Sequence, residues 1–150
     1  MFRSSVGKYR CIIPADGFYE WKMIDPDKKT EQPMYVQLKN KSMFGFAGLY
    51  TAPSEKYPGG TAAIITTTPN ELMASVHNRM PAILLPALED VWLDPKMTDT
   101  GEALTLLTPY PADAMIATRV STKVNTAANE GAELILPIGR DQGTTFSDAA

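Results

Sequence analysis

The chain has 150 residues, a formal net charge of −3, 44% hydrophobic residues and 21% charged residues. These values are typical of a folded domain with its own core and exclude the composition of intrinsically disordered chains. No apolar run reaches the roughly 20 residues that a membrane helix needs, and residues 1–8 do not form a secretory signal. A single Cys and a single His argue against a disulfide framework and against a dedicated metal site.

The charges are unevenly distributed along the chain. As far as Lys41 there are eight Lys and Arg against five Asp and Glu, whereas the remainder has six against twelve. The overall negative charge argues against nonspecific coating of nucleic acid. A basic face carried by the first third still leaves short-range phosphate binding open.

The first half of the chain reads as strands joined by polar or glycine-rich turns. The predicted strands cover residues 11–15, 18–22, 33–38, 43–50 and 61–68. Because only the turn around Asn40 separates the third strand from the fourth, the pattern predicts that these two pair as a hairpin.

The second half inserts single helices among strands. Thr68, Pro69 and Glu71 fit a capping box, so we expect a helix from Pro69 to Val76. The other expected elements are helices at 86–93 and 100–107, strands at 81–85 and 115–121, and a short closing element at 133–137. This order predicts an α+β fold rather than a parallel βαβ sheet. We expect one domain over residues 1–150, with 140–150 as a disordered tail.

The segment Phe18-Tyr19-Glu20-Trp21 places a carboxylate between aromatic side chains. Aromatic cover on both flanks of Glu20 would desolvate the carboxyl group and suit it to proton transfer. Trp21 would offer a face on which a base can stack. The alternative is a strand in which Glu20 points to solvent, which ordinary strand alternation also produces.

The sole histidine lies in the segment His77-Asn78-Arg79-Met80-Pro81. An imidazole can donate or accept a proton near neutral pH. Arg79 is two residues further on, so in an extended segment it points the same way, and a guanidinium suits a phosphate or a developing oxyanion. A capping histidine beside a surface arginine is the structural alternative. The spacing predicts acid/base chemistry on an oxyanion-bearing substrate.

Three further groups have both a functional and a structural interpretation. Cys11 could form a cysteine-hydrolase triad with His77 and Glu20, although a thiol in an apolar strand is usually an inert packing residue. The hydroxyls of residues 66–68 could bind a phosphate, or serve only the strand and the helix cap. The polar loop from Asn125 could contact a ligand, or only turn the chain.

Several of these segments together resemble the SRAP family, whose members are abasic-site processing proteins, also called SOS-response-associated peptidases. The matching segments are Arg10–Trp21, Ala47–Tyr50, Ile64–Asn70, His77–Pro81 and Val120–Asn125. They occur in the order of the family and extend over nearly the whole chain. The resemblance implies an SRAP-type fold with a largely antiparallel, barrel-like sheet core and short helices.

The resemblance also implies a function. Family members recognise abasic sites in single-stranded DNA and capture them through an N-terminal cysteine, which removal of the initiator Met exposes. Its α-amine and thiol close a thiazolidine on the ring-opened sugar. The resemblance implies that Glu20 and His77 serve proton transfer, that Arg79 holds a phosphate, that Trp21 packs against the DNA, and that Thr66 contacts a phosphate. It implies a peptidase or lyase that uses no cofactor and no metal, in the cytoplasm and at the nucleoid when acting.

This sequence departs from the family at its start. Phe2 follows Met1 where the family has its nucleophile, and family members carry a long segment before the motif that contains Cys11. We therefore expect a fold that is incomplete at its N-terminus, an exposed apolar groove, self-association, and a complementing N-terminal segment as a partner. Two alternatives stay open: a crosslinking-dead remnant that binds single-stranded DNA, and a small cysteine hydrolase that uses Cys11 and His77.

Overall fold

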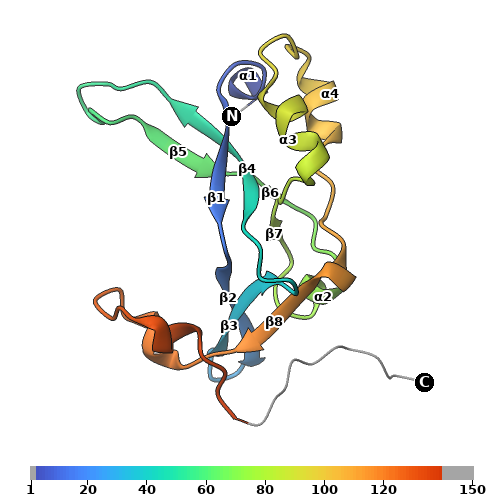
Figure 1. The fold of residues 1–150 in the computed structure, drawn as a ribbon. Coiled ribbons are helices and arrows are strands. Elements are labelled where there is room, and N and C mark those ends of the chain that lie inside the picture. Colours follow the sequence, from blue (N-terminus) through green and yellow to red (C-terminus); the bar gives the residue numbers. More distant parts are fainter. Residues whose placement is uncertain (1–2, 140–150) are drawn as a thin grey trace. The chain divides into compact units, whose positions relative to one another are not determined.

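The computed structural model describes residues 3–139 (Figure 1). Contacts within the chain group its residues into two compact units, which are described separately. Unit 1 takes its described residues from Met1–Ala15, Met43–Thr68 and Arg79–Tyr110, and unit 2 from Asp16–Ser42, Pro69–Asn78 and Pro111–Ala150. The expected tail at 140–150 lies outside the described residues, and a single domain over residues 1–150 stays a prediction.

Unit 1 contains a three-stranded antiparallel sheet in the order β1-β4-β5. Its strands are β1 (Arg10–Ala15), β4 (Phe44–Thr51) and β5 (Thr61–Ile64), and a two-stranded sheet pairs β6 (Thr66–Thr67) with β7 (Met80–Pro81). Its helices are α1 (Arg3–Val6), α3 (Pro86–Leu93) and α4 (Thr100–Thr105). The core of this unit is formed by Val6, Ala47, Leu49, Ala82, Leu84, Trp92, Met97 and Ala103.

A buried arginine ties the helices of unit 1 to its sheet. The Arg10 guanidinium donates hydrogen bonds to the backbone carbonyls of Val6, Trp92 and Asp94, and it lies 5.6 Å from the centre of the Trp92 ring. The Trp92 indole in turn donates to the carbonyl of Cys11 at 2.9 Å. Because these carbonyls lie at the C-terminal ends of α1 and α3, the cation meets the negative ends of two helices.

Unit 2 contains a second antiparallel sheet, in the order β2-β3-β8. Its strands are β2 (Phe18–Asp25), β3 (Thr30–Leu38) and β8 (Met115–Arg119). The unit also has helix α2 (Glu71–Ala74) and the 3-10 helices η1 (Ala112–Ala114), η2 (Thr122–Asn125) and η3 (Ala132–Ile135). The central strand β3 is buried from Gln32 to Val36, and because successive side chains point to opposite faces, both faces of the strand are covered there.

Gly17 allows a close approach between the start of β2 and β3. A Cβ atom at Gly17 would overlap Cζ and Oη of Tyr35. The Tyr35 ring also contacts the Tyr19 ring, with centroids 5.4 Å apart. Burial raises the pKa of both phenols, and the negative charge of Asp16 raises it further. The glycine is therefore required by the volume of the tyrosine, not by a turn.

The α+β fold with largely antiparallel sheets is confirmed, as are α3 over residues 86–93 and a strand from Met115. Among residues 3–139 the sheets remain open, so no closed barrel is present there. No helix in this range is both long and apolar enough to cross a membrane.

Four local predictions are wrong. The strand expected at 81–85 is replaced by the shorter β7 (Met80–Pro81), which is followed by an isolated bridge between Ile83 and Phe46. The hairpin between 33–38 and 43–50 does not form, because β3 pairs with β2 and β8 whereas β4 pairs with β1 and β5. The strand predicted at 61–68 is interrupted at Ile65, whose N–H and carbonyl bond to Ala47 and Ala82. The helix expected at 69–76 covers only Glu71–Ala74, because the Asn70 side chain caps it by accepting from the N–H of Met73 at 2.9 Å.

We expect Gly17→Ala to lower the free energy of unfolding by about 1–3 kcal/mol, because the added methyl group forces the Tyr35 ring out of its position. Urea denaturation followed by circular dichroism measures the change. Gly59→Ala is the matched control, since a Cβ there meets no atom within 4 Å. Equal stability of the two variants would contradict the close packing at Gly17.

Candidate functional site

Glu20 and Trp21 are neighbours on β2, and their side chains leave the strand on opposite faces. Successive strand residues alternate, so Glu20 shares its face with Phe18 and Lys22, whereas Trp21 shares the other face with Tyr19. The expectation that Tyr19 and Trp21 cover both flanks of the carboxylate is therefore wrong. Glu20 is half-buried, and its Oε1 accepts a hydrogen bond from the backbone N–H of Trp21 at 3.3 Å.

The Trp21 side chain is held by a residue distant in the sequence. Its indole Nε1–H donates to Oδ1 of Asn125, which lies in η2, at 2.8 Å. Trp21 is half-buried and Asn125 is exposed, so the ring keeps part of its surface open to solvent. An indole that is fixed at one edge and partly exposed can receive a stacked base.

His77 follows α2 in unit 2. Its backbone N–H donates to the carbonyl of Met73 at 2.8 Å, which holds the chain close to the end of this short helix. Asn70 caps the other end of α2, and its Nδ2 lies 3.3 Å from the Met115 sulfur on β8. The side chain of His77 is exposed. The N-terminal end of the helix is thus tied to β8, and the imidazole that follows the helix lies at the surface.

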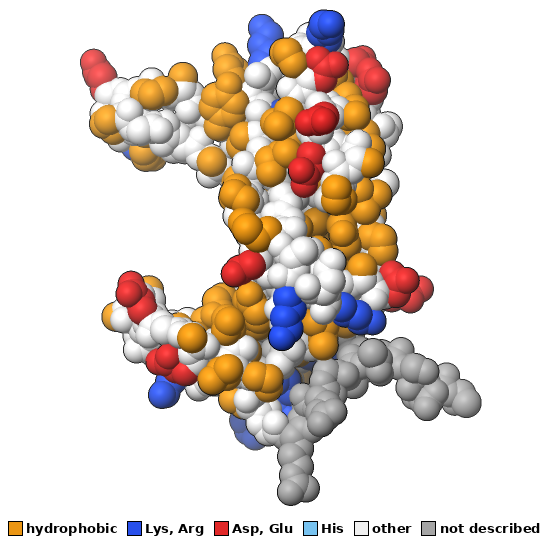
Figure 2. Space-filling view, viewed as in Figure 1, with side chains coloured by type: hydrophobic (Ala, Val, Ile, Leu, Met, Phe, Trp, Pro, Cys, Tyr) orange, Lys and Arg blue, Asp and Glu red, His pale blue; other side chains and the backbone are white. Residues whose placement is uncertain are grey.

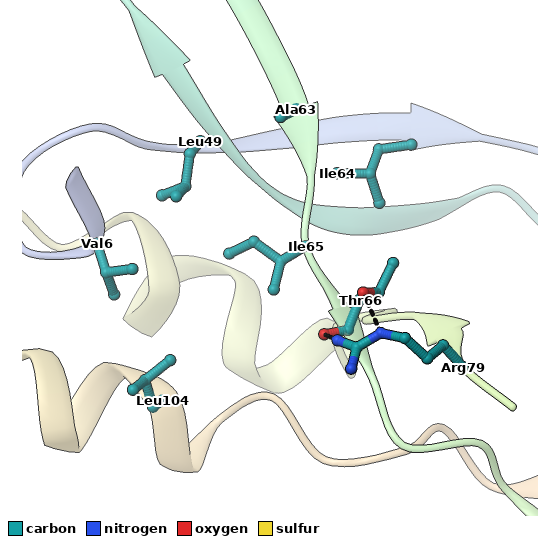
Figure 3. A pocket seen from close by; sticks show the side chains of 8 residues that line it. All are labelled: Val6, Leu49, Ala63, Ile64, Ile65, Thr66, Arg79 and Leu104. Atoms are coloured by element: carbon teal, nitrogen blue, oxygen red, sulfur yellow. Dashed lines mark hydrogen bonds between the residues drawn. The ribbon is translucent and has the colours of Figure 1, made fainter. Parts of the chain in front are cut away.

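Arg79 and Thr66 form a pair in unit 1, where β6 lies beside β7 (Figure 3). The Arg79 Nε donates to Oγ1 of Thr66 at 2.8 Å, and Nη2 donates to the Thr66 carbonyl at 2.8 Å. Both residues are exposed. Two bonds to one residue fix the plane of the guanidinium, so an anion would meet donors that are already oriented.

The Arg79–Thr66 pair stands at one end of an open pocket of about 370 Å³ (Figure 3). Apart from this pair, the pocket is lined by aliphatic side chains of unit 1: Val6, Leu49, Ala63, Ile64, Ile65 and Leu104. Ile64 and Leu104 are each 43% exposed, and hydrophobic side chains are visible over much of the drawn surface (Figure 2). The pocket therefore combines an apolar lining with a cationic end.

Cys11 lies in β1 opposite Gly48. A Cβ at Gly48 would come within 2.9 Å of the Cys11 sulfur, so the thiol packs closely against β4. Burial raises the pKa of the Cys11 thiol, which lowers the thiolate population that a nucleophile needs. These properties are those of a packing residue.

The predicted site residues therefore divide between the two units. Unit 1 brings Thr66 and Arg79 into contact, whereas unit 2 contains Glu20, Trp21 and His77. Within residues 3–139 no cluster of His, Cys, Asp and Glu side chains could hold a metal ion. Sequence reasoning left the role of Asn125 open, and it predicted an exposed apolar groove without the residues that line it, because both depend on contacts between distant segments.

Comparison with known proteins decides the family. A model of the family described as SOS response associated peptidase (SRAP) matches residues 1–127. The chain belongs to the SRAP family. An SRAP relative from Bacillus subtilis, the abasic site processing protein YoqW, is 51% identical over 136 residues, which are 89% of this chain and 60% of the relative.

More distant relatives and solved structures agree with this SRAP assignment. The abasic site processing protein HMCES of Gallus gallus is 33% identical over 86% of this chain and 44% of its own length. A crystal structure of a Bacteroides thetaiotaomicron protein superposes with a TM-score of 0.79 at 30% identity, over 91% of this chain and 60% of that chain. This SRAP chain thus spans about 60% of the length of the Bacillus relative.

We expect Cys11 to be alkylated slowly by iodoacetamide near neutral pH, and its rate to rise only at a higher pH than that of free cysteine. The reason is that the thiolate reacts and burial raises the pKa of this thiol. Mass spectrometry of timed samples measures the rate, and the urea-unfolded chain is the control. Fast alkylation of the native chain would contradict the packing role and favour the cysteine hydrolase.

Proposed function

We propose that this chain binds abasic sites in single-stranded DNA. The observation that carries the proposal is the exposed Arg79 guanidinium, fixed by two hydrogen bonds to Thr66 and so prepared for a phosphate. The names of the relatives supply the substrate class, since the Bacillus and chicken proteins are both called abasic site processing proteins. Such a role places the chain in the cytoplasm, at the nucleoid DNA.

Each predicted site residue has a defined part in this proposal. Arg79 and Thr66 contact a phosphate of the DNA, and Trp21 stacks against a base beside the lesion. Glu20 and His77 move protons at the sugar. A ring-opened abasic sugar is an aldehyde, and its reactions with an amine need proton donors and acceptors at the oxygen and nitrogen.

We propose that these proton transfers serve covalent capture when an SRAP chain has a terminal cysteine, which is the chemistry that the family resemblance implies. The α-amine nitrogen bonds to the aldehyde carbon and water leaves, which gives an imine. The thiol sulfur then bonds to that carbon while its proton passes to the nitrogen, so a thiazolidine forms. An acid such as Glu20 or His77 would protonate the leaving oxygen. Removal of the initiator Met is the peptidase step of the same proposal.

A second candidate is DNA binding without covalent capture. It is favoured by Cys11, the one thiol of the chain, which is packed against β4 and has a raised pKa. In this second candidate function the Arg79–Thr66 pair and Trp21 still bind DNA, whereas no thiol of this chain closes a thiazolidine ring on the abasic sugar.

We expect Arg79→Ala to weaken binding of an abasic-site oligonucleotide by about 10-fold and to reduce the salt slope by about 1, because one phosphate contact is lost. Fluorescence anisotropy at several salt concentrations measures both quantities. Lys96→Ala is the matched control, since it removes an exposed positive charge of the same unit. Equal losses in the two variants would mean that Arg79 contributes only general charge.

A denaturing gel of the same mixtures separates the two candidate functions. A shifted band shows a covalent adduct, and the absence of a band beside measurable anisotropy shows binding alone. An adduct that Cys11→Ala abolishes would overturn the packing role of Cys11.

We further propose that the apolar pocket of unit 1 receives a complementing N-terminal segment. The pocket is open and aliphatic, and β5, which lines it, pairs with β4 alone among the described strands. Polypeptide of suitable length exists in the relatives, since this chain matches only 60% of the Bacillus protein. An extended apolar segment could add to β5 as a strand and place side chains in the pocket.

We expect the chain alone to self-associate, and a polypeptide with the unmatched part of the Bacillus relative to suppress this. Analytical ultracentrifugation measures the association. Ile64→Lys should weaken the complex by about 10-fold or more, because it puts a charge against the pocket. Ile24→Lys is the control, since Ile24 is 56% exposed in unit 2. A complex insensitive to Ile64→Lys would exclude the pocket as its docking site.

A further inference from the structure

The bond between Trp21 and Asn125 joins residues 104 positions apart in the sequence, at 2.8 Å. An indole nitrogen can only donate, so the asparagine must turn its oxygen toward the ring. The acceptor bonds to the polar edge of the indole. This hydrogen bond therefore restrains the two side-chain torsions of Trp21, whose rotation would otherwise let the ring swing away from the strand.

Asn125 is itself held on a well-supported loop. It ends η2, whose N-cap is Ser121, and the Ser121 hydroxyl accepts from the N–H of Lys123 at 3.3 Å. The Asn129 side chain donates to the Lys123 carbonyl at 2.7 Å, which closes the other side of the loop. An acceptor mounted on such a loop has a defined position.

The loop is also tied to the sheet that carries Trp21. The N–H of Val120 donates to the carbonyl of Pro33 on β3 at 3.1 Å, and Val120 is fully buried. Trp21 lies opposite Pro33 in the register of β2 and β3. The ring and its acceptor are therefore both tied to β3 at Pro33, Trp21 through strand pairing and the loop of Asn125 through Val120, so the positions of both hydrogen-bond partners are fixed.

We infer that Asn125 is a positioning residue that holds the Trp21 indole in the orientation in which its face stacks on DNA. The inference rests on the proposed function and extends it to a residue that does not itself need to contact the DNA. A ring that is already oriented loses less rotational freedom when a base stacks on it, so binding is tighter. Asn125 thus acts through Trp21.

The first test observes the indole in the absence of DNA. The chain has two tryptophans, so a ¹⁵N-labelled sample gives two indole N–H resonances, and Trp21→Phe assigns them. We expect Asn125→Ala to move the Trp21 resonance toward that of a free indole and to speed its exchange with water. The Trp92 resonance should stay in place, because its partner is the carbonyl of Cys11.

Two variants sharpen this test. Asn125→Asp keeps an acceptor oxygen and should retain the bonded position of the Trp21 resonance. Asn40→Ala is the matched control, because Asn40 is an exposed loop asparagine of the same unit whose side chain accepts from Ser42 and not from the Trp21 indole. A Trp21 resonance that Asn125→Ala leaves unchanged would overturn the inference.

The second test measures binding of fluorescein-labelled single-stranded DNA that carries a tetrahydrofuran abasic analogue. We expect Asn125→Ala to weaken binding by about 2- to 10-fold, as for loss of one hydrogen bond. Trp21→Ala and the double variant should bind equally weakly, because the asparagine acts only through the ring.

The failures of the two proposals are distinguishable. If the wild-type chain binds no single-stranded DNA, the proposed function fails and the role of Asn125 fails with it. If the wild type binds and the two substitutions weaken binding additively, or if Asn125→Ala binds as well as the wild type, the inference alone is overturned.

Discussion

The structure of unit 1 depends on a buried positive charge that has no acidic partner among its described contacts. The Arg10 guanidinium is compensated by three backbone carbonyls and by the face of Trp92. A buried cation without such partners would be very costly, so the segments that supply them must stay in place. In this way one side chain at the start of β1 fixes the ends of α1 and α3, and the sheet they pack on carries β5 and the pocket.

Three residues of the proposed site and its support lie where regular structure is short or ends. Thr66 is in the two-residue strand β6, His77 follows the last turn of α2, and Asn125 ends a 3-10 helix. DNA binding requires side chains at such exposed ends of secondary structure, because the DNA must reach them. Rigidity comes from backbone and side-chain hydrogen bonds around them, as in the pair of bonds from Arg79 to Thr66.

The correct predictions from the sequence rest on signals that lie within a few residues of the element they predict. Helix α3 has the expected bounds because Pro86 suits its first turn and Pro95 follows its end, and both signals lie within a few residues. The separation of β3 from β4 into different sheets could not be read in this way, since each strand takes one of its two partners, β8 for β3 and β1 for β4, from a distant part of the chain. For the same reason the motifs located Trp21 and Arg79, whereas the partnership of Trp21 with Asn125 needed the fold.

The register of β2 against β3 limits which insertions and deletions this protein can tolerate during evolution. Glu20 faces Met34 and Trp21 faces Pro33, with an irregularity after Met23. If an inserted or deleted residue shifted the pairing by one position, every side chain of β2 would exchange faces. Glu20 and Trp21 would then trade places relative to Asn125. Length changes in the turn that joins these strands are therefore far less tolerable than substitutions there.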